Sequence, residues 1–162
     1  DPIAFIEGGE GAVAEAAQAS SKAVGILSSK SQPRAILFET ALHGTLLDLD
    51  KEDGKRGYPK GMSADRINAG LGCIISQVLE QAGREKIAGL YTTGGDTMVN
   101  VCYQLGVECI EVMDYVIPQA DVGRLVGNYD GLPVVGKGGL TGGEQTACEI
   151  VSRLFGESSR YA

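Results

Sequence analysis

Hydrophobic residues recur at helical spacing in four parts of the chain, and each part predicts an amphipathic helix. The predicted helices cover residues 10–29, 63–82, 96–105 and 144–155. The segment 63–82 has the clearest pattern, because Ser63 offers an N-cap and Gly83 a helix stop. Each of these helices presents one apolar face, so each needs another layer to pack against.

Short apolar runs lie between the predicted helices and predict β-strands. They cover residues 34–39, 87–91, 107–113 and 132–135, with an extra strand around 123–126. Strands that alternate with helices are typical of a parallel sheet with helices on both faces. We therefore predict an α/β fold with a mainly parallel sheet in a Rossmann-like, three-layer arrangement. The pattern is lost between Thr40 and Met62, where we expect a long loop.

Glycine makes up 24 of the 162 residues, which is about twice its ordinary share. Two glycine-rich segments, Thr93 to Asp96 and Gly136 to Gly143, each follow a predicted strand and open into a predicted helix. Ligands of parallel α/β sheets bind beyond the carboxyl ends of the strands. The free N–H groups at a helix start attract anions, and Lys137 adds a positive charge. The two segments together therefore predict a phosphate-binding site.

Two other glycine patterns match known phosphate-binding motifs less well. Gly131 to Lys137 has the spacing of a P-loop, but Gly138 stands where that motif needs Ser or Thr. Gly9 to Ala14 matches the dinucleotide fingerprint, with a short strand expected at residues 3–6 and Glu39 as the ribose-binding acid. This second pattern keeps an NAD-binding oxidoreductase domain open as an alternative.

The charge balance argues against several classes of protein. With 14 basic and 21 acidic residues, the net charge of −7 argues against nucleic acid and membrane surfaces as partners. No apolar stretch is long enough to span a membrane, and no signal peptide is visible. The four cysteines form no CxxC pair, so we expect buried, reduced thiols in a cytoplasmic protein. His43 is the only histidine, and no metal site is expected from it.

The two glycine segments resemble those of a known family. Thr92 to Thr97 (TTGGDT) after a strand, followed by Leu132 to Gly142 (LPVVGKGGLTG), is similar to the C-terminal nucleotide-binding domain of the four-carbon acid sugar kinases. The resemblance is specific over residues 90–154 and loose before them. The second segment has Leu140-Thr141-Gly142 where the family more commonly has Phe-Gly.

This resemblance implies ATP-dependent phosphorylation, with Mg²⁺, of a sugar acid such as threonate, erythronate or 3-oxo-tetronate. It implies nucleotide contacts at Thr93, Gly94, Gly95, Asp96, Lys137, Gly138, Gly139 and Gly142. Asp96 is the candidate catalytic residue, acting on Mg²⁺ or on the acceptor hydroxyl. Because the family has two domains in a longer chain, residues 1–162 are predicted to be a single nucleotide-binding domain, the C-terminal part of such a kinase.

The N-terminal domain of the family has no counterpart in these residues, and the sugar acid is expected to bind there. A strand with a serine-containing loop is likewise expected before Asp1. We therefore predict that this chain alone is inactive and that the full-length protein is the kinase. A homo-oligomer is left open. A non-catalytic nucleotide- or metabolite-binding module remains an alternative, because it would bind ligand without turning it over.

Overall fold

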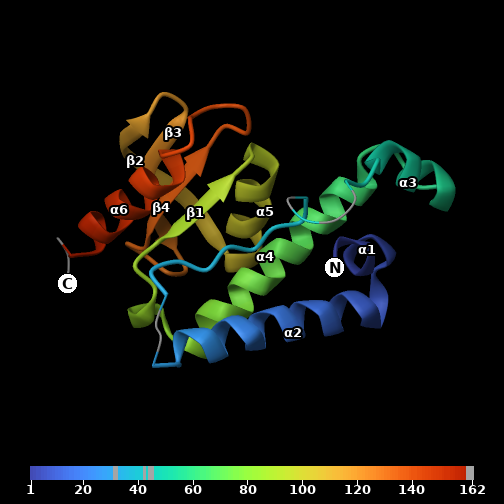
Figure 1. Ribbon diagram of the computed structural model, residues 1–162, viewed down its shortest axis with the longest axis horizontal. Coiled ribbons are helices and arrows are strands. Elements are labelled where there is room, and N and C mark those ends of the chain that lie inside the picture. Colours follow the sequence, from blue (N-terminus) through green and yellow to red (C-terminus); the bar gives the residue numbers. More distant parts are fainter. Residues whose placement is uncertain (31–32, 42, 44–45, 160–162) are drawn as a thin grey trace.

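The structure is a computed structural model, and it describes residues 1–30, 33–41, 43 and 46–159. Its helices are α1 (Pro2–Glu7), α2 (Gly9–Leu27), α3 (Leu49–Arg56), α4 (Met62–Ala82), the short 3₁₀ helix η1 (Arg84–Lys86), α5 (Gly95–Leu105) and α6 (Thr146–Ser159). Its strands are β1 (Leu90–Thr93), β2 (Val107–Ile117), β3 (Ala120–Gly127) and β4 (Pro133–Lys137). Figure 1 shows the sheet with α5 and α6 at one end of the molecule, and α1, α2 and α3 near the long helix α4 at the other.

The four strands form one mixed sheet in the order β1-β4-β3-β2. Among the described strands only β1 and β4 run parallel, while β3 is antiparallel to both β4 and β2. The predicted mainly parallel, Rossmann-like sheet is therefore wrong. The reason lies in the connections, because residues 118–119 join β2 to β3 and residues 128–132 join β3 to β4. Links this short turn the chain back on itself, whereas a parallel crossover needs a dozen residues or more.

Helices pack on both faces of this sheet. On one face, Leu105 of α5 and Leu79 of α4 pack in a cluster with Val134 of β4. On the other face, Ile150 of α6 packs in a cluster with Val135, the next residue of the same strand. Successive side chains of a strand point to opposite faces, so β4 contributes to both cores. The end of β4 is thereby fixed between α5 and α6.

The strand expected at residues 3–6 is wrong, because these residues belong to helix α1. The Asp1 side chain accepts the N–H of Ile3 at 2.9 Å, and Pro2 occupies the first helical turn. Both features favour a helix start. An N-cap side chain accepts a backbone N–H that has no carbonyl partner within the helix, and proline fits the first turn. An apolar run this short has no periodicity that separates a helix from a strand.

The strand expected at residues 34–39 is also wrong, because these residues join no sheet in the described part of the chain. Ile36 and Phe38 instead pack against a cluster formed by residues of α1, α2 and α4. The segment also reaches α6, where the Arg34 guanidinium lies 5.0 Å from the centre of the Phe155 ring. The predicted burial of this run is confirmed only in part, because Ile36 and Phe38 are half-buried whereas Ala35 and Leu37 are exposed.

The region from Thr40 to Met62 was expected to be a loop, and part of it is helix α3. Asp48 caps this helix by accepting the N–H of Lys51 at 3.1 Å, and Gly57 ends it in the left-handed conformation. These are the usual start and stop signals of a helix, although its eight residues are too polar to show an apolar face. Residues 42, 44 and 45 of the expected loop lie outside the described residues.

Helix α3 is joined to the start of α4 by a buried carboxylate. Asp53 accepts the N–H of Gly61 at 2.7 Å and the N–H of Ser63 at 2.8 Å. Hydrogen bonding by Ser63, followed by that of Gly61, holds the pKa of the Asp53 carboxyl below its ordinary value. The carboxylate satisfies backbone donors at the start of α4 that have no partner within the helix.

Helix α6 is held to the sheet by a buried ion-pair cluster. Glu157 is 1 % exposed and lies 2.9 Å from Arg153 and 3.4 Å from Arg124 of β3. Arg153 also contacts Asp114 of β2 at 2.9 Å. The N–H of Tyr115, together with Arg153, holds the pKa of the Asp114 carboxyl below its ordinary value. The cluster fixes the last helix against the two antiparallel strands.

The four predicted helices are confirmed as α2, α4, α5 and α6, and the last begins two residues later than predicted. The prediction of buried thiols is wrong for Cys109 and Cys148, which are exposed, although all four cysteines are free. In the part of the chain that the structure describes, no helix combines the length and the apolar character needed to cross a membrane.

Candidate functional site

The two glycine segments lie side by side at one end of the parallel strand pair. Thr93, the last residue of β1, is paired in register with Lys137, the last residue of β4. The N–H of Gly94 then donates to the carbonyl oxygen of Lys137 at 2.9 Å. The sequence predicted that both segments follow neighbouring strands, and the geometry confirms their adjacency. Whether they bind a nucleotide remains a prediction.

The first segment turns directly from β1 into helix α5. Gly94 has a φ of 97°, a left-handed value that favours glycine. Gly95 and Asp96 are the first two residues of α5, and both are exposed. A Cβ built at Gly95 would meet no atom within 4 Å, so the space above this backbone is open. The first N–H groups of an α-helix have no partner within it, so this turn can approach an anion closely.

A polar contact with α4 holds the first turn of α5 in place. The Thr97 hydroxyl donates to the Asn68 Oδ1 atom at 2.8 Å. Sequence analysis did not single out Asn68, because this contact joins residues from two different helices and no local motif marks it. The position offered one weak signal, a polar amide next to the apolar Ile67 on a helix with a largely apolar inward face.

The second segment folds around the side chain of Lys137. The Nζ atom donates to the carbonyl oxygens of Gly138 at 2.5 Å, Thr141 at 2.9 Å and Gly139 at 3.5 Å. An ammonium group has three donors, so these carbonyls satisfy it and curl the backbone around it. Lys137 is the only Lys or Arg in residues 136–146. Its charge therefore lies at the centre of the loop.

In the rest of the second segment, one part of the backbone is hydrogen-bonded and another part is exposed. The N–H of Gly138 donates to the carbonyl of Gln119 at 2.8 Å, which ties the segment to the β2–β3 turn. Gly139 is exposed with nothing within 4 Å of an added Cβ, and Gly142 is exposed with a φ of 94°. Sequence analysis did not anticipate Gln119, because it lies in a turn whose place beside β4 depends on the antiparallel sheet.

All eight predicted site residues thus lie in these two adjacent segments. Thr93, Gly95, Asp96, Gly139 and Gly142 are exposed, and Gly94, Lys137 and Gly138 are half-buried. Thr92 precedes Thr93 in β1, and its buried hydroxyl oxygen has no hydrogen-bond partner among the described residues. On the opposite side of β1, burial raises the pKa of the Tyr91 phenol.

The dinucleotide alternative does not fit this geometry. Residues 9–14 lie within the first turns of helix α2, and residues 3–6 form α1. A dinucleotide fingerprint needs a strand, a tight glycine turn and then a helix, so that the backbone can approach a pyrophosphate. The P-loop spacing fails for a similar reason, because residues 133–137 are strand β4 rather than a loop.

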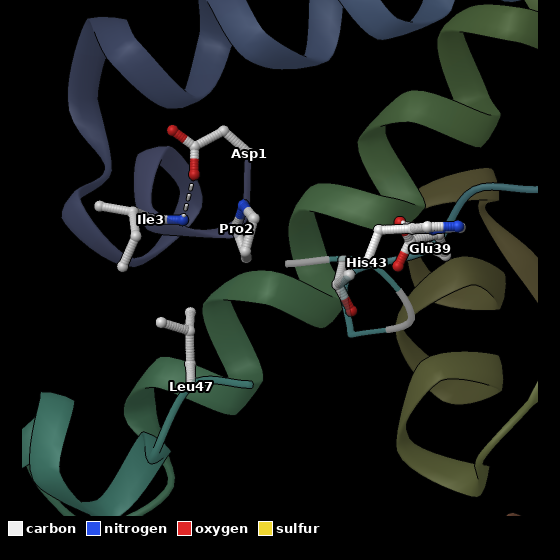
Figure 2. Close-up of a pocket in the computed structure, with 7 residues that line it drawn as sticks. Asp1, Pro2, Ile3, Glu39, His43 and Leu47 are labelled. Atoms are coloured by element: carbon white, nitrogen blue, oxygen red, sulfur yellow. Dashed lines mark hydrogen bonds and ion pairs between the residues drawn. The ribbon is translucent and has the colours of Figure 1, made fainter. Parts of the chain in front are cut away.

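Two hollows are lined by residues of the N-terminal half of the chain. The larger, of about 300 Å³, is lined by Asp1, Pro2, Ile3, Glu39, Thr40, His43 and Leu47. Figure 2 shows it between α1 and the segment that carries Glu39 and His43, whose side chains are 3.0 Å apart. The smaller hollow, of about 160 Å³, shares Thr40 and Leu47 with it and is also lined by Asn68.

Comparison with protein families defines the class of this chain. The model of a family described as the nucleotide-binding C-terminal domain matches residues 1–147, and the chain belongs to that family. The match covers both strand ends and the whole of both glycine segments. It bears out the resemblance to the C-terminal domain of the four-carbon acid sugar kinases.

Two curated relatives are kinases of four-carbon sugar acids. The chain is 43 % identical over 93 residues to the D-erythronate kinase of Heliobacterium modesticaldum, covering 57 % of this chain and 21 % of that protein. It is 32 % identical over 98 residues to the D-threonate kinase of Salmonella typhimurium, covering 60 % of this chain and 22 % of that protein. The matched region thus spans little more than a fifth of either relative.

A protein of Bordetella bronchiseptica, described as a domain of unknown function, has a similar fold. Its two crystal forms match with TM-scores of 0.53 and 0.56 at 22 % identity. The matches cover 86 % and 87 % of this chain, and 38 % and 37 % of the Bordetella chain. That protein was crystallised as a domain-swapped dimer with bound citrate. At this identity the similarity concerns the fold alone.

Proposed function

We propose that the full-length protein is an ATP-dependent kinase of a four-carbon sugar acid, and that this chain supplies its ATP site. The observation that carries the proposal is the adjacency of the two glycine segments, joined by the hydrogen bond from Gly94 to Lys137. The family of nucleotide-binding domains and the two kinase relatives support it. Phosphoryl transfer mainly requires positioning and charge stabilisation, which backbone donors and a lysine can provide.

The open backbone at the two segments fits a chain of phosphates. The space above Gly95 in the first turn of α5 is open, and Lys137 of the adjacent segment carries a positive charge. Asp96 is exposed at the start of α5, and its carboxylate oxygens are ligands of the kind that Mg²⁺ prefers. We assign Asp96 to the metal or to the acceptor hydroxyl, and the remaining predicted residues to the phosphates.

The rest of the assignment follows from the length of the relatives. The matched region is little more than a fifth of each kinase, so the sugar acid is proposed to bind to another part of the full-length protein. Threonate, erythronate and 3-oxo-tetronate are the candidate substrates. A homo-oligomer and a cytoplasmic location complete the proposal, and this chain alone is expected to have no kinase activity.

Substitution of Gly95 by valine tests the proposal. The valine side chain would extend into the open space above the first turn of α5, where a phosphate would lie. We expect the full-length Gly95→Val variant to fold but to bind ADP with an affinity at least about tenfold lower, measured by calorimetry. ATP turnover with erythronate or threonate should fall with it.

The matched control is Gly11→Val. Gly11 is also an exposed glycine in the first turns of a helix, α2, with nothing within 4 Å of an added Cβ. This variant should retain wild-type ADP affinity. Equal ADP affinity in the wild type and in Gly95→Val would contradict the proposed site, and a wild type that binds ADP but turns over neither acid would favour a non-catalytic module.

A further inference from the structure

Gln119 is the second residue of the two-residue turn between β2 and β3, and its backbone is left-handed. Its φ is 65°, and Pro118 precedes it in the turn. A turn with proline first and a positive φ second ordinarily has glycine or asparagine at the second position, because other side chains crowd their own backbone there. Strained backbone positions of this kind cluster at functional sites, so the side chain of Gln119 is a candidate for a functional role.

The side chain of Gln119 lies against the second glycine segment. A Cβ added to Gly138 would lie 3.0 Å from the Gln119 Oε1 atom and 3.4 Å from the Thr141 hydroxyl oxygen. The Gln119 side chain is exposed, and its amide has no hydrogen-bond partner among the residues that the structure describes. A side-chain amide carries two N–H donors, so this group can donate to a ligand beside Gly138.

Several donors of the second segment are already bonded within the protein. The N–H of Gly138 donates to the carbonyl oxygen of Gln119 at 2.8 Å. The Lys137 ammonium and the Thr141 hydroxyl both donate to the carbonyl oxygen of Gly138, at 2.5 Å and 3.0 Å. Phosphate oxygens only accept hydrogen bonds, so a phosphate at Gly138 needs a donor that is not already bonded. The Gln119 amide meets this requirement.

We propose that the Gln119 side-chain amide donates a hydrogen bond to a phosphate oxygen of the bound nucleotide, beside Gly138. The proposal rests on the proposed function, because it assumes that phosphates bind at the glycine segments. The left-handed turn brings both the carbonyl and the side chain of Gln119 to Gly138. The β2–β3 hairpin thereby adds a contact to a site otherwise built at the ends of β1 and β4.

Replacement of Gln119 by glycine separates the role of the side chain from that of the turn. Glycine adopts a positive φ without strain and keeps the carbonyl that accepts the Gly138 N–H. We expect the full-length Gln119→Gly variant to unfold at the same urea concentration as the wild type or at a higher one. Its affinity for ADP, measured by calorimetry, should be about tenfold lower, because a hydrogen bond to a charged group is lost.

Gln119→Glu keeps the size of the side chain and replaces its donors by a carboxylate. Because a carboxylate repels phosphate, the full-length variant should bind ADP at least about tenfold more weakly. Amide hydrogen exchange of Gly138 without nucleotide should keep its wild-type rate, since the Gln119 carbonyl is unchanged. Gln18→Glu is the matched control, because it adds the same charge at an exposed glutamine of α2. It should leave ADP affinity unchanged.

The assignment of Gln119 is overturned if Gln119→Gly binds ADP as the wild type does, or if Gln119→Glu weakens binding no more than Gln18→Glu. Faster exchange of Gly138 in Gln119→Glu, together with weaker binding, would also overturn it, because Gln119 would then act on the loop alone. The proposed function survives these outcomes if Gly95→Val still lowers ADP affinity. If the wild type does not bind ADP, the proposed function fails and this assignment fails with it.

Discussion

Lys137 ends β4 with its ammonium group bonded to three carbonyls of its own loop. It therefore supplies a charge and also holds the backbone of residues 138–141 in a curl. We expect Lys137→Met to lower ADP affinity by about tenfold or more, because the positive charge near the proposed phosphate position is lost. Amide hydrogen exchange of residues 138–142 should become faster even without nucleotide.

The exchange measurement separates two roles of this lysine. A side chain that only contacts phosphate would leave the exchange of the empty loop unchanged on substitution. Unchanged exchange together with weaker ADP binding would therefore contradict the structural role of Lys137. Its contacts with the loop carbonyls were not predicted from the sequence, which indicated only a positive charge near phosphate.

The eight predicted site residues came from local patterns, since glycine segments between a strand and a helix have a fixed order in the chain. Asn68 and Gln119 were not predicted from such patterns, because each reaches the site through a contact between segments that are distant in the sequence. Asn68 contacts Thr97, which is 29 residues further along the chain. A single sequence carries no local signal for such a pair.

At the scale of elements, α4 and α5 approach each other closely at Gly72. A Cβ at this position would lie 2.7 Å from the Gln104 Cγ atom and 2.9 Å from the Asn100 carbonyl oxygen. Because the second neighbour is backbone, the helices would have to separate. We expect Gly72→Ala to lower the free energy of unfolding by about 1–3 kcal/mol, measured by urea denaturation.

Gly25→Ala provides the comparison for this substitution. Gly25 lies in α2 with open space around an added Cβ, and its φ is not left-handed. Here alanine should raise the free energy of unfolding by up to about 1 kcal/mol, because glycine is costly inside a helix. If both substitutions changed the free energy of unfolding in the same direction, the close approach at Gly72 would be contradicted.

The helices were more predictable than the strands. Segments such as 63–82 repeat their apolar positions over several turns, which distinguishes a helix clearly. Residues 34–39 offered only a short apolar run, and helices of the N-terminal half cover it instead of a sheet. Helix α3 was missed because its start and stop signals border a segment with no apolar face.

At the scale of the whole molecule, buried and paired carboxylates link stability to pH. The pKa values of Asp53 and Asp114 are lowered in the folded state by hydrogen bonds from Ser63 and from Tyr115, respectively. A lowered pKa contributes stability above the unfolded value of about 4. That contribution is lost as the pH falls through the folded values.

We therefore expect the melting temperature to fall as the pH is lowered from about 5 towards about 2. Asp53→Asn should melt at a lower temperature than the wild type near neutral pH and show a smaller decrease on acidification, measured by circular dichroism. A wild-type melting temperature that is constant over this pH range would contradict the link between protonation of these carboxylates and stability.

The architecture of the sheet was the largest error of prediction. The alternation of helices and strands favoured parallel pairing, yet residues 114–130 contain all of β3 and the two-residue turn before it. Sequence analysis predicted only an extra strand around residues 123–126 in this stretch, so the antiparallel hairpin was not recognised. The adjacency of the two glycine segments was nevertheless predicted, because it depends on β1 and β4, the described pair that is parallel.

The sheet order also determines when the parts of the molecule form. Two residues separate β2 from β3, so their pairing closes a very short loop, whereas residues 94–132 lie between β1 and β4. Closing a long loop costs more entropy, and local contacts therefore form earlier during folding. We expect the hairpin to form first and the β1–β4 pair last. A refolding chain would then acquire its two glycine turns as neighbours only after the rest of the sheet exists.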